Sequence, residues 1–201
     1  MAGLDLRPAT DVDLPLVVDV TDGAAVAEAV ARAGGLGDVE AVVSVAGVYE
    51  MVPLEDITPD AWRRMLRLHL GGLLNLARAA VPGMVERGRG SVVGITSELA
   101  IGGGDGDAHY AAVKGAVIGL VRSLAAELAP TGVRVNAVAP GPTDTPLLDA
   151  DSPWREPGYL ATLPARALVA PEEVALAVAF LVEEGTFCCG EVLSPNAGAV
   201  I

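Results

Sequence analysis

The sequence has little positive charge and little cysteine. Its 201 residues hold 13 Lys and Arg side chains against 26 Asp and Glu, a formal net charge of −13. Such a chain repels phosphate backbones and anionic membrane surfaces, which argues against nucleic acid as a partner. The two cysteines, Cys188 and Cys189, are adjacent and have no histidine or third cysteine nearby in sequence. We therefore expect inert thiols in a reducing compartment and no metal site.

The chain also lacks a long apolar run. No charge-free apolar stretch reaches the ~18 residues expected of a membrane span. Residues 1–25 scatter acidic side chains through the region where a signal peptide needs an uninterrupted apolar core. We expect a cytoplasmic protein with no membrane partner. Its length and its 52% hydrophobic content suit one compact domain, 1–201, with no internal repeat or low-complexity linker.

Short apolar runs of strand length alternate with longer patterns of helical length. Buried strands that alternate with helices imply a parallel sheet covered on both faces, so we expect an α/β, doubly wound, three-layer fold. Thr58-Pro59 and Ala170-Pro171 are typical of helix starts, and Pro130 and Gly132 of a helix end. The expected strands are 14–20, 40–47, 90–97, 133–141 and 190–195, and the expected helices are 25–34, 59–86, 110–129 and 171–184.

Candidate site residues are those that directly follow the predicted strands. In open parallel sheets, ligands bind outside the carboxyl ends of the strands, where the strand order reverses. The longest segment without clear periodicity, 142–171, is rich in Pro and Asp, and we expect it to form a substrate loop or lid. The strand-end candidates are Asp5, Asp19, Ala46-Gly47, Ser97 and Pro140-Gly141.

One helix carries a tyrosine and a lysine four positions apart. Tyr110 and Lys114 share a helix face. Because an opposite charge favours phenolate, Lys114 is expected to lower the Tyr110 pKa and to prepare it for proton exchange with an alcohol. Ser97, at the end of the preceding strand, can return beside this helix start and bond the same oxygen. Taken alone, the pair also fits an interfacial tyrosine with a snorkelling lysine.

Five elements together resemble the short-chain dehydrogenase/reductase family. They are "VVDVTD" (17–22), "VSVAG" (43–47), "GITS" ending at Ser97, "YAAVK" (110–114) and "VRVNAVAPGPTDTP" (133–146), in family order and spacing. The resemblance implies a Rossmann-like fold and hydride transfer between a nicotinamide and a small secondary alcohol or ketone. It also implies that Tyr110 is the acid/base, that Ser97 polarises the carbonyl, and that Lys114 holds the nicotinamide ribose.

The same resemblance implies a set of cofactor contacts. Asp5, at the end of a strand similar to the family's second one, would bond the adenosine 2′-hydroxyl and repel a 2′-phosphate, which favours NAD over NADP. Arg7, two residues later, weakens that preference. Thr145 would position the nicotinamide carboxamide. The remaining implied cofactor contacts are Asp19, Val20, Ala46, Gly47, Tyr110, Lys114, Pro140 and Gly141.

Within the family, "DTPLL", the run 163–184 and the ending "GEVLSPNAGAVI" are most similar to the 3-hydroxyacyl-CoA dehydrogenase type II subgroup and its 17β-hydroxysteroid dehydrogenase members. Among the departures from the family pattern, two bear directly on the site. The family's first strand, Gly-rich turn and helix, which hold the cofactor pyrophosphate, have no counterpart here, so a βα unit of roughly 30 residues is expected to be missing. His69 occupies the position of a family Asn that holds a water, and it either relays protons or packs inside the helices.

Three functions remain open at this point. The first is an oxidoreductase with Tyr110, Ser97, Lys114 and His69 as catalytic residues. The second is a non-catalytic subunit that has lost its pyrophosphate site, and the third is a cofactor-independent dehydratase or cyclase. Small residues along 59–86 and 110–129 favour a homodimer or homotetramer through these helices.

Overall fold

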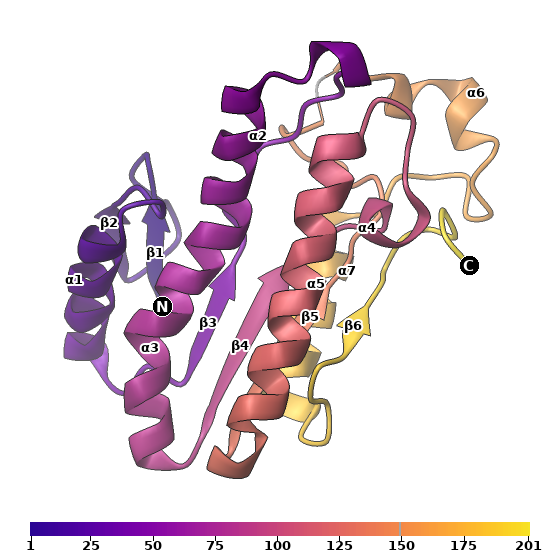
Figure 1. Cartoon of the computed structure of the whole chain (residues 1–201). Helices are drawn as coiled ribbons and strands as arrows, with labels where there is room; N and C mark the ends of the chain where they lie inside the picture. The colour runs from indigo at the N-terminus through magenta and orange to yellow at the C-terminus, as the bar shows by residue number, and fades with distance from the viewer. Residues whose placement is uncertain (149) are drawn as a thin grey trace.

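Six parallel strands form two separate sheets in the computed structural model, which describes residues 1–148 and 150–201 (Figure 1). The smaller sheet pairs β1 (Ala2–Asp5) with β2 (Leu14–Val17). The larger sheet has the spatial order β3-β4-β5-β6. Its strands are β3 (Ala41–Ser44), β4 (Gly90–Ile95), β5 (Val133–Val138) and β6 (Val192–Leu193).

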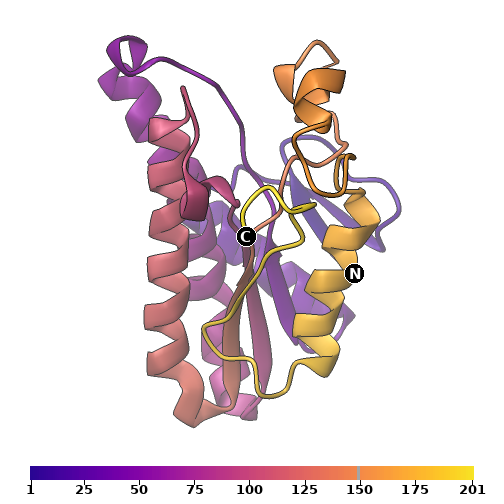
Figure 2. The ribbon, with the colours of Figure 1, turned by 90° about the vertical axis from the view of Figure 1, so that its right-hand side faces the viewer.

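Helices cover the larger sheet on both faces, as the alternating pattern predicts. Figures 1 and 2 show α3 and α5 on one face and α7 on the other, which is the expected three-layer α/β arrangement. The helices are α1 (Gly23–Ala33), α2 (Pro59–Met65), α3 (Gly72–Arg87), α4 (Leu99–Gly102), α5 (Ala108–Leu128), α6 (Pro157–Leu160) and α7 (Pro171–Ala179).

The predicted helix 59–86 is interrupted. It begins as expected, with the Thr58 hydroxyl accepting a hydrogen bond from the Ala61 amide and Pro59 in the first turn, and it ends before Gly88 in a left-handed conformation. Between α2 and α3, residues Leu66–Gly71 form a π-helical segment that no periodicity indicated. A second π-helical segment, Phe180–Glu184, extends α7. Such segments often occur at functional sites.

The core lies on both faces of β4 and β5. Val92 packs with α3 and α5 residues such as Leu73 and Val121, whereas its neighbour Val93 packs on the other face against Leu181. Adjacent strand residues point to opposite faces, so a strand buried on both sides is apolar at successive positions. Valines of this core are fully buried: Val92, Val93, Val133, Val135 and Val138.

The smaller sheet is attached mainly through α1 and α3. Val20 and Val26 pack against Leu76 of α3, and the Asn75 side-chain amide donates to the Val20 carbonyl at 2.9 Å. In Figure 1, β1 lies between β2 and β3, yet β1 and β3 belong to different sheets. The described strands therefore form two sheets, with a break between β1 and β3.

None of the described helices is long and apolar enough to cross a membrane. The described residues also contain no group of three or more His, Cys, Asp or Glu side chains arranged to hold a metal ion. Cys188 is half-buried and Cys189 exposed, and both are free thiols.

Candidate active site

Ser97, Tyr110 and Lys114 come together at the carboxyl end of β4. Two hydrogen bonds fasten α5 to this strand end: the Thr96 hydroxyl donates to the Lys114 carbonyl at 2.7 Å, and the Lys114 ammonium donates to the Ile95 carbonyl at 2.9 Å. Ser97, Tyr110 and Lys114 are all buried. The strand end and the helix start thus hold the three side chains in fixed positions, as the sequence predicts.

The electrostatics of Tyr110 differ from the expectation. Burial raises the pKa of Tyr110, the nearby Glu98 carboxyl raises it further, and a hydrogen bond with Ser97 opposes the shift. Lys114 does not lower the pKa of Tyr110 as predicted, because its ammonium is bonded to Ile95 and lies 5.5 Å from the centre of the Tyr110 ring. Burial also lowers the pKa of Lys114 to about 8. In this structure Tyr110 is a neutral phenol.

His69 joins this group from the π-helical segment. Its Nε2 lies 2.9 Å from the Val48 carbonyl, and its ring meets the Tyr110 ring edge-on with centroids 5.7 Å apart. Burial, with Lys114 contributing, lowers the pKa of His69 to about 3, so the imidazole is neutral. A Cβ at Gly47 would lie 2.5 Å from His69 Cε1, which explains why a glycine stands there.

Aromatic side chains connect Tyr110 to the segment 142–171, and no residue spacing in the sequence indicated this connection. The Tyr49 ring meets the Tyr110 ring edge-on at 5.0 Å, and the Tyr49 hydroxyl accepts a hydrogen bond of 2.9 Å from the Trp154 indole. Trp154 in turn packs edge-on against Tyr159 at 4.7 Å. The position of Tyr49 just after a strand end was the available signal. The 142–171 segment therefore contacts the site through a tryptophan.

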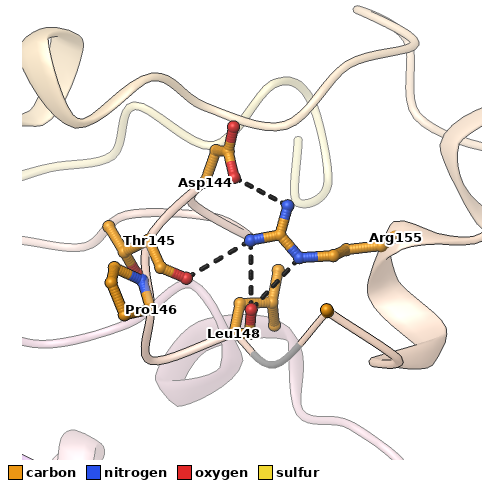
Figure 3. Close-up of a pocket in the computed structure, with 6 residues that line it drawn as sticks. Asp144, Thr145, Pro146, Leu148 and Arg155 are labelled. Atoms are coloured by element: carbon orange, nitrogen blue, oxygen red, sulfur yellow. Dashed lines mark hydrogen bonds and ion pairs between the residues drawn. The ribbon is translucent and has the colours of Figure 1, made fainter.

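Two hollows border the 142–171 segment. One, of about 610 Å³, contains Arg155, whose guanidinium bonds the Asp144 carboxylate at 2.6 Å and the Thr145 carbonyl at 3.3 Å (Figure 3). Its lining residues are Asp144, Thr145, Pro146, Leu148, Ala150 and Arg155. The other, of about 800 Å³, is lined by residues of the segments 49–52 and 147–154, Tyr49 and Trp154 among them. Thr145, an expected cofactor contact, thus lines the first hollow.

The Pro140-Gly141 turn lies next to Glu98, the residue after Ser97. The Glu98 amide donates to the Pro140 carbonyl and the Gly141 amide to the Pro195 carbonyl, each at 3.1 Å. A Cβ at Gly141 would lie 2.7 Å from the Asn196 backbone, so the close approach of the C-terminal strand requires glycine here. This turn completes one wall of the site.

The predicted adenosine contacts lie apart, on the smaller sheet. The exposed Asp5 carboxylate accepts from the Arg7 amide at 2.9 Å. Asp19, also exposed, accepts from the Thr21 amide at 2.8 Å, and this bond lowers the pKa of Asp19. Val20 is buried beneath them and serves as a core residue.

Comparison with known proteins identifies the family of this chain. A family profile described as Enoyl-(Acyl carrier protein) reductase matches residues 4–199. The chain belongs to the short-chain dehydrogenase/reductase family. It is 33% identical over 189 residues to a 3-oxoacyl-[acyl-carrier-protein] reductase of Thermotoga maritima, covering 93% of this chain and 77% of that protein.

Two further relatives are of the same kind. A cis-4-hydroxycyclohexanecarboxylate dehydrogenase of Sinomonas cyclohexanicum is 36% identical over 196 residues, or 96% of this chain and 79% of that protein. The 3-oxoacyl-[acyl-carrier-protein] reductase of Escherichia coli is 34% identical over 185 residues, or 91% of this chain and 76% of that protein. The chain is thus a member of an oxidoreductase family that acts on alcohol and ketone groups with a nicotinamide cofactor.

The described residues fit one half of such a cofactor better than the other. At the expected nicotinamide position, Tyr110 and Lys114 are buried, and the Pro140-Gly141 turn is hydrogen-bonded to the residue after Ser97. The unit expected to hold the pyrophosphate has no counterpart among the described residues, and α1, which follows β2, is not a substitute, because the Asp22 carboxylate caps its N-terminus by accepting from the Ala24 and Ala25 amides. An acidic N-cap also repels phosphate.

Proposed function

We propose that this chain is an oxidoreductase that transfers a hydride between NAD(H) and a secondary alcohol or ketone. The observation that carries the proposal is the convergence of Ser97, Tyr110 and Lys114 at the carboxyl end of β4, where open parallel sheets place their ligands. A bound nicotinamide would supply or accept the hydride. The chain's own residues would orient the substrate and move its proton.

Tyr110 is proposed as the proton donor in ketone reduction. Its raised pKa keeps the proton on the phenol until negative charge develops on the substrate oxygen. Ser97 would donate a hydrogen bond to the same oxygen. Lys114, held by the Ile95 carbonyl, would bond the nicotinamide ribose and stabilise the phenolate after proton transfer. Neutral His69, behind Tyr110, would return a proton through water.

The proposed substrate carries an apolar or ring-shaped part beside its ketone or alcohol. The names of two relatives, a 3-oxoacyl reductase and a hydroxycyclohexanecarboxylate dehydrogenase, both denote such compounds. The hollow of about 800 Å³ is lined by the aromatic residues Tyr49 and Trp154 and by Leu148, and these side chains would contact the apolar part of the substrate. A 3-hydroxyacyl-CoA or a hydroxysteroid satisfies this description, and the 142–171 segment would close over it as a lid.

NAD is proposed as the cofactor because Asp5 stands at the end of β1. An acid there accepts a bond from a ribose hydroxyl and repels a 2′-phosphate. The Arg7 amide orients the Asp5 carboxylate and leaves its second oxygen for the ribose. The preference for NAD over NADP would come from repulsion between the Asp5 carboxylate and the 2′-phosphate of NADP, more than from any contact with the nicotinamide.

A second candidate is a non-catalytic member of the family. The break between β1 and β3 favours it, since a strand–turn–helix unit that would carry the pyrophosphate is proposed to be absent from this chain. Such a chain would keep the fold and the Tyr110 wall but bind the cofactor weakly. Titrating NADH into the folded protein by calorimetry separates the two candidates, because the oxidoreductase binds NADH tightly and the non-catalytic member only weakly.

The decisive experiment for the oxidoreductase is Tyr110→Phe. Removing one hydroxyl should lower ketone reduction at least about 100-fold, because a positioned acid contributes that much or more. NADH affinity should stay within about twofold of the unsubstituted protein, since the ring and Lys114 remain. Turnover that survives in Tyr110→Phe would overturn the assignment, whereas lost turnover with lost folding would be recognised by circular dichroism.

A further inference from the structure

The hydroxyl of Ser97 is engaged by its neighbour in sequence. Ser97 Oγ accepts a hydrogen bond from the Leu99 amide at 3.2 Å and donates one to Glu98 Oε2 at 2.8 Å. A serine hydroxyl has one proton to donate. Glu98 and Tyr110 are the two side chains that compete for it. While that proton points at Glu98, as it does here, Ser97 has none to offer Tyr110 or a substrate oxygen.

Glu98 is an unusual group to find here, because it is a carboxyl with only 7% of its surface exposed. Among the salt bridges of the described residues, none involves Glu98. The titratable groups that face it are Tyr110 on α5, Asp107 before α5, Tyr49 after β3 and Tyr159 on α6.

These surroundings favour the protonated form of the acid. Burial raises the pKa of Glu98, and the Asp107 carboxyl adds to that shift, while the bond from Ser97 opposes it. The tyrosines that face it bring no positive charge. Lys114, the chain's single lysine, donates to the Ile95 carbonyl instead.

We propose that Glu98 is a positioning residue whose protonation state sets the direction of the Ser97 hydroxyl and thereby switches Ser97 between an idle and a carbonyl-polarising state. This inference rests on the proposed oxidoreductase function. With Glu98 ionised, the Ser97 proton stays on the Glu98 side. With Glu98 protonated, its own O–H donates to Ser97 Oγ, and the Ser97 proton turns to the substrate oxygen.

The switch leaves the balance of the reaction unchanged. In reduction, a bound nicotinamide would supply the hydride, with its electron pair, for the carbonyl carbon, and Tyr110 would give its proton to the oxygen. Glu98 neither gains nor loses a proton during turnover, because it only holds Ser97 in the donating orientation. Reduction should therefore slow as pH rises through the Glu98 pKa.

The test compares Glu98→Gln with Glu98→Asp in pH profiles of kcat/KM for ketone reduction. The amide of Glu98→Gln donates to Ser97 at every pH, as protonated Glu98 does. In Glu98→Gln, we expect the fall in kcat/KM that is assigned to Glu98 to disappear. At pH values above the Glu98 pKa, kcat/KM of this variant should exceed that of the unsubstituted protein by about tenfold, which is a fraction of what one oxyanion donor contributes. Glu98→Asp, which still titrates, should keep a falling limb.

Two outcomes overturn the proposal. One is a Glu98→Gln profile that keeps the same falling limb as the unsubstituted protein. The other is a uniform loss of activity at every pH, which would mean that Glu98 has a structural role only. Because the natural chain contains no glutamine, selective ¹⁵N labelling gives Glu98→Gln a single side-chain amide signal that reports whether the site is folded.

A readout without turnover separates this inference from the proposed function. In protein labelled with ¹³C at the Glu side-chain carboxyl, the Glu98 signal is identified by NMR as the one that is missing from the spectrum of Glu98→Gln. Its titration midpoint should lie at a higher pH than the midpoints of the exposed glutamates. Ser97→Ala removes a bond to the carboxylate and should raise the Glu98 pKa further. If the signal does not respond to Ser97→Ala, the switch is wrong. If it responds in a chain that binds no cofactor and reduces no ketone, the oxidoreductase proposal fails while the Ser97–Glu98 coupling stands.

Discussion

The two sheets of this protein differ in how completely they are buried. In the larger sheet, the core valines of β4 and β5 have no exposed surface, and helices cover both faces. In the smaller sheet, Leu16 is buried but its neighbour Val17 is 64% exposed. The proposed catalytic side chains lie at the end of β4 and on α5, which packs on the larger sheet. The proposed adenosine contacts lie in or directly after the strands of the smaller sheet. The proposed chemistry would therefore rest on the more completely buried part of the molecule, and the proposed cofactor anchoring on the less buried part.

The largest expected difference is in stability. Leu73 is 1% exposed and packs under β4, so Leu73→Ala should lower the free energy of unfolding by about 2–5 kcal/mol. Leu4 of β1 is only partly buried against the Val20 cluster, so Leu4→Ala should cost about 1 kcal/mol, below that range. Urea unfolding followed by circular dichroism measures both. Equal losses would show that the two sheets form one equally packed core.

A second prediction concerns pH and the larger sheet alone. The folded-state pKa of Lys114 is lowered from 10.5 to about 8, so between these values the unfolded chain binds more protons than the folded one. Stability should therefore rise with pH across that window, by on the order of 1–3 kcal/mol relative to Lys114→Met. The chain has no other lysine, and its tyrosines and cysteines titrate in both proteins. Parallel stability curves for the two proteins from pH 8 to 10.5 would refute the shift.

The smallest predicted effect belongs to the exposed end of β1. Asp5→Ser removes a negative charge and keeps a short polar side chain, so the ratio of NADPH to NADH affinity should rise by about tenfold. Calorimetric titration with both cofactors measures this ratio. Asp11→Ser, an exposed acid in the loop before β2, is the matched control and should leave it unchanged. A ratio that does not move in Asp5→Ser would mean that β1 does not contact the adenosine.

Local patterns in the sequence predicted most of the elements. Thr58-Pro59 begins α2, Gly132 follows the last turn of α5, and the apolar runs become β4 and β5. The spacing of Tyr110 and Lys114 predicted a shared helix face, because helix geometry depends on nearby residues only.

Other features could not be predicted because they depend on contacts between distant residues. The π-helical segment places His69 against Val48, and the aromatic contacts join Tyr49, Tyr110 and Trp154 across the fold. The sequence argued that Lys114 would lower the Tyr110 pKa, whereas burial raises it. A pKa depends on the solvent and the charges that surround a group, and neither is visible in residue spacing.

The sequence by itself determined the order of strands and helices, the parallel sheet and the positions of Ser97, Tyr110 and Lys114, because these follow from periodicity, caps and spacing along one chain. Only the tertiary structure decided that the strands form two sheets, that Lys114 bonds a strand carbonyl and that Glu98 is buried beside Ser97. Burial and hydrogen-bond choice arise when distant segments meet and exclude water. The protonation states of this site are therefore a property of the folded molecule.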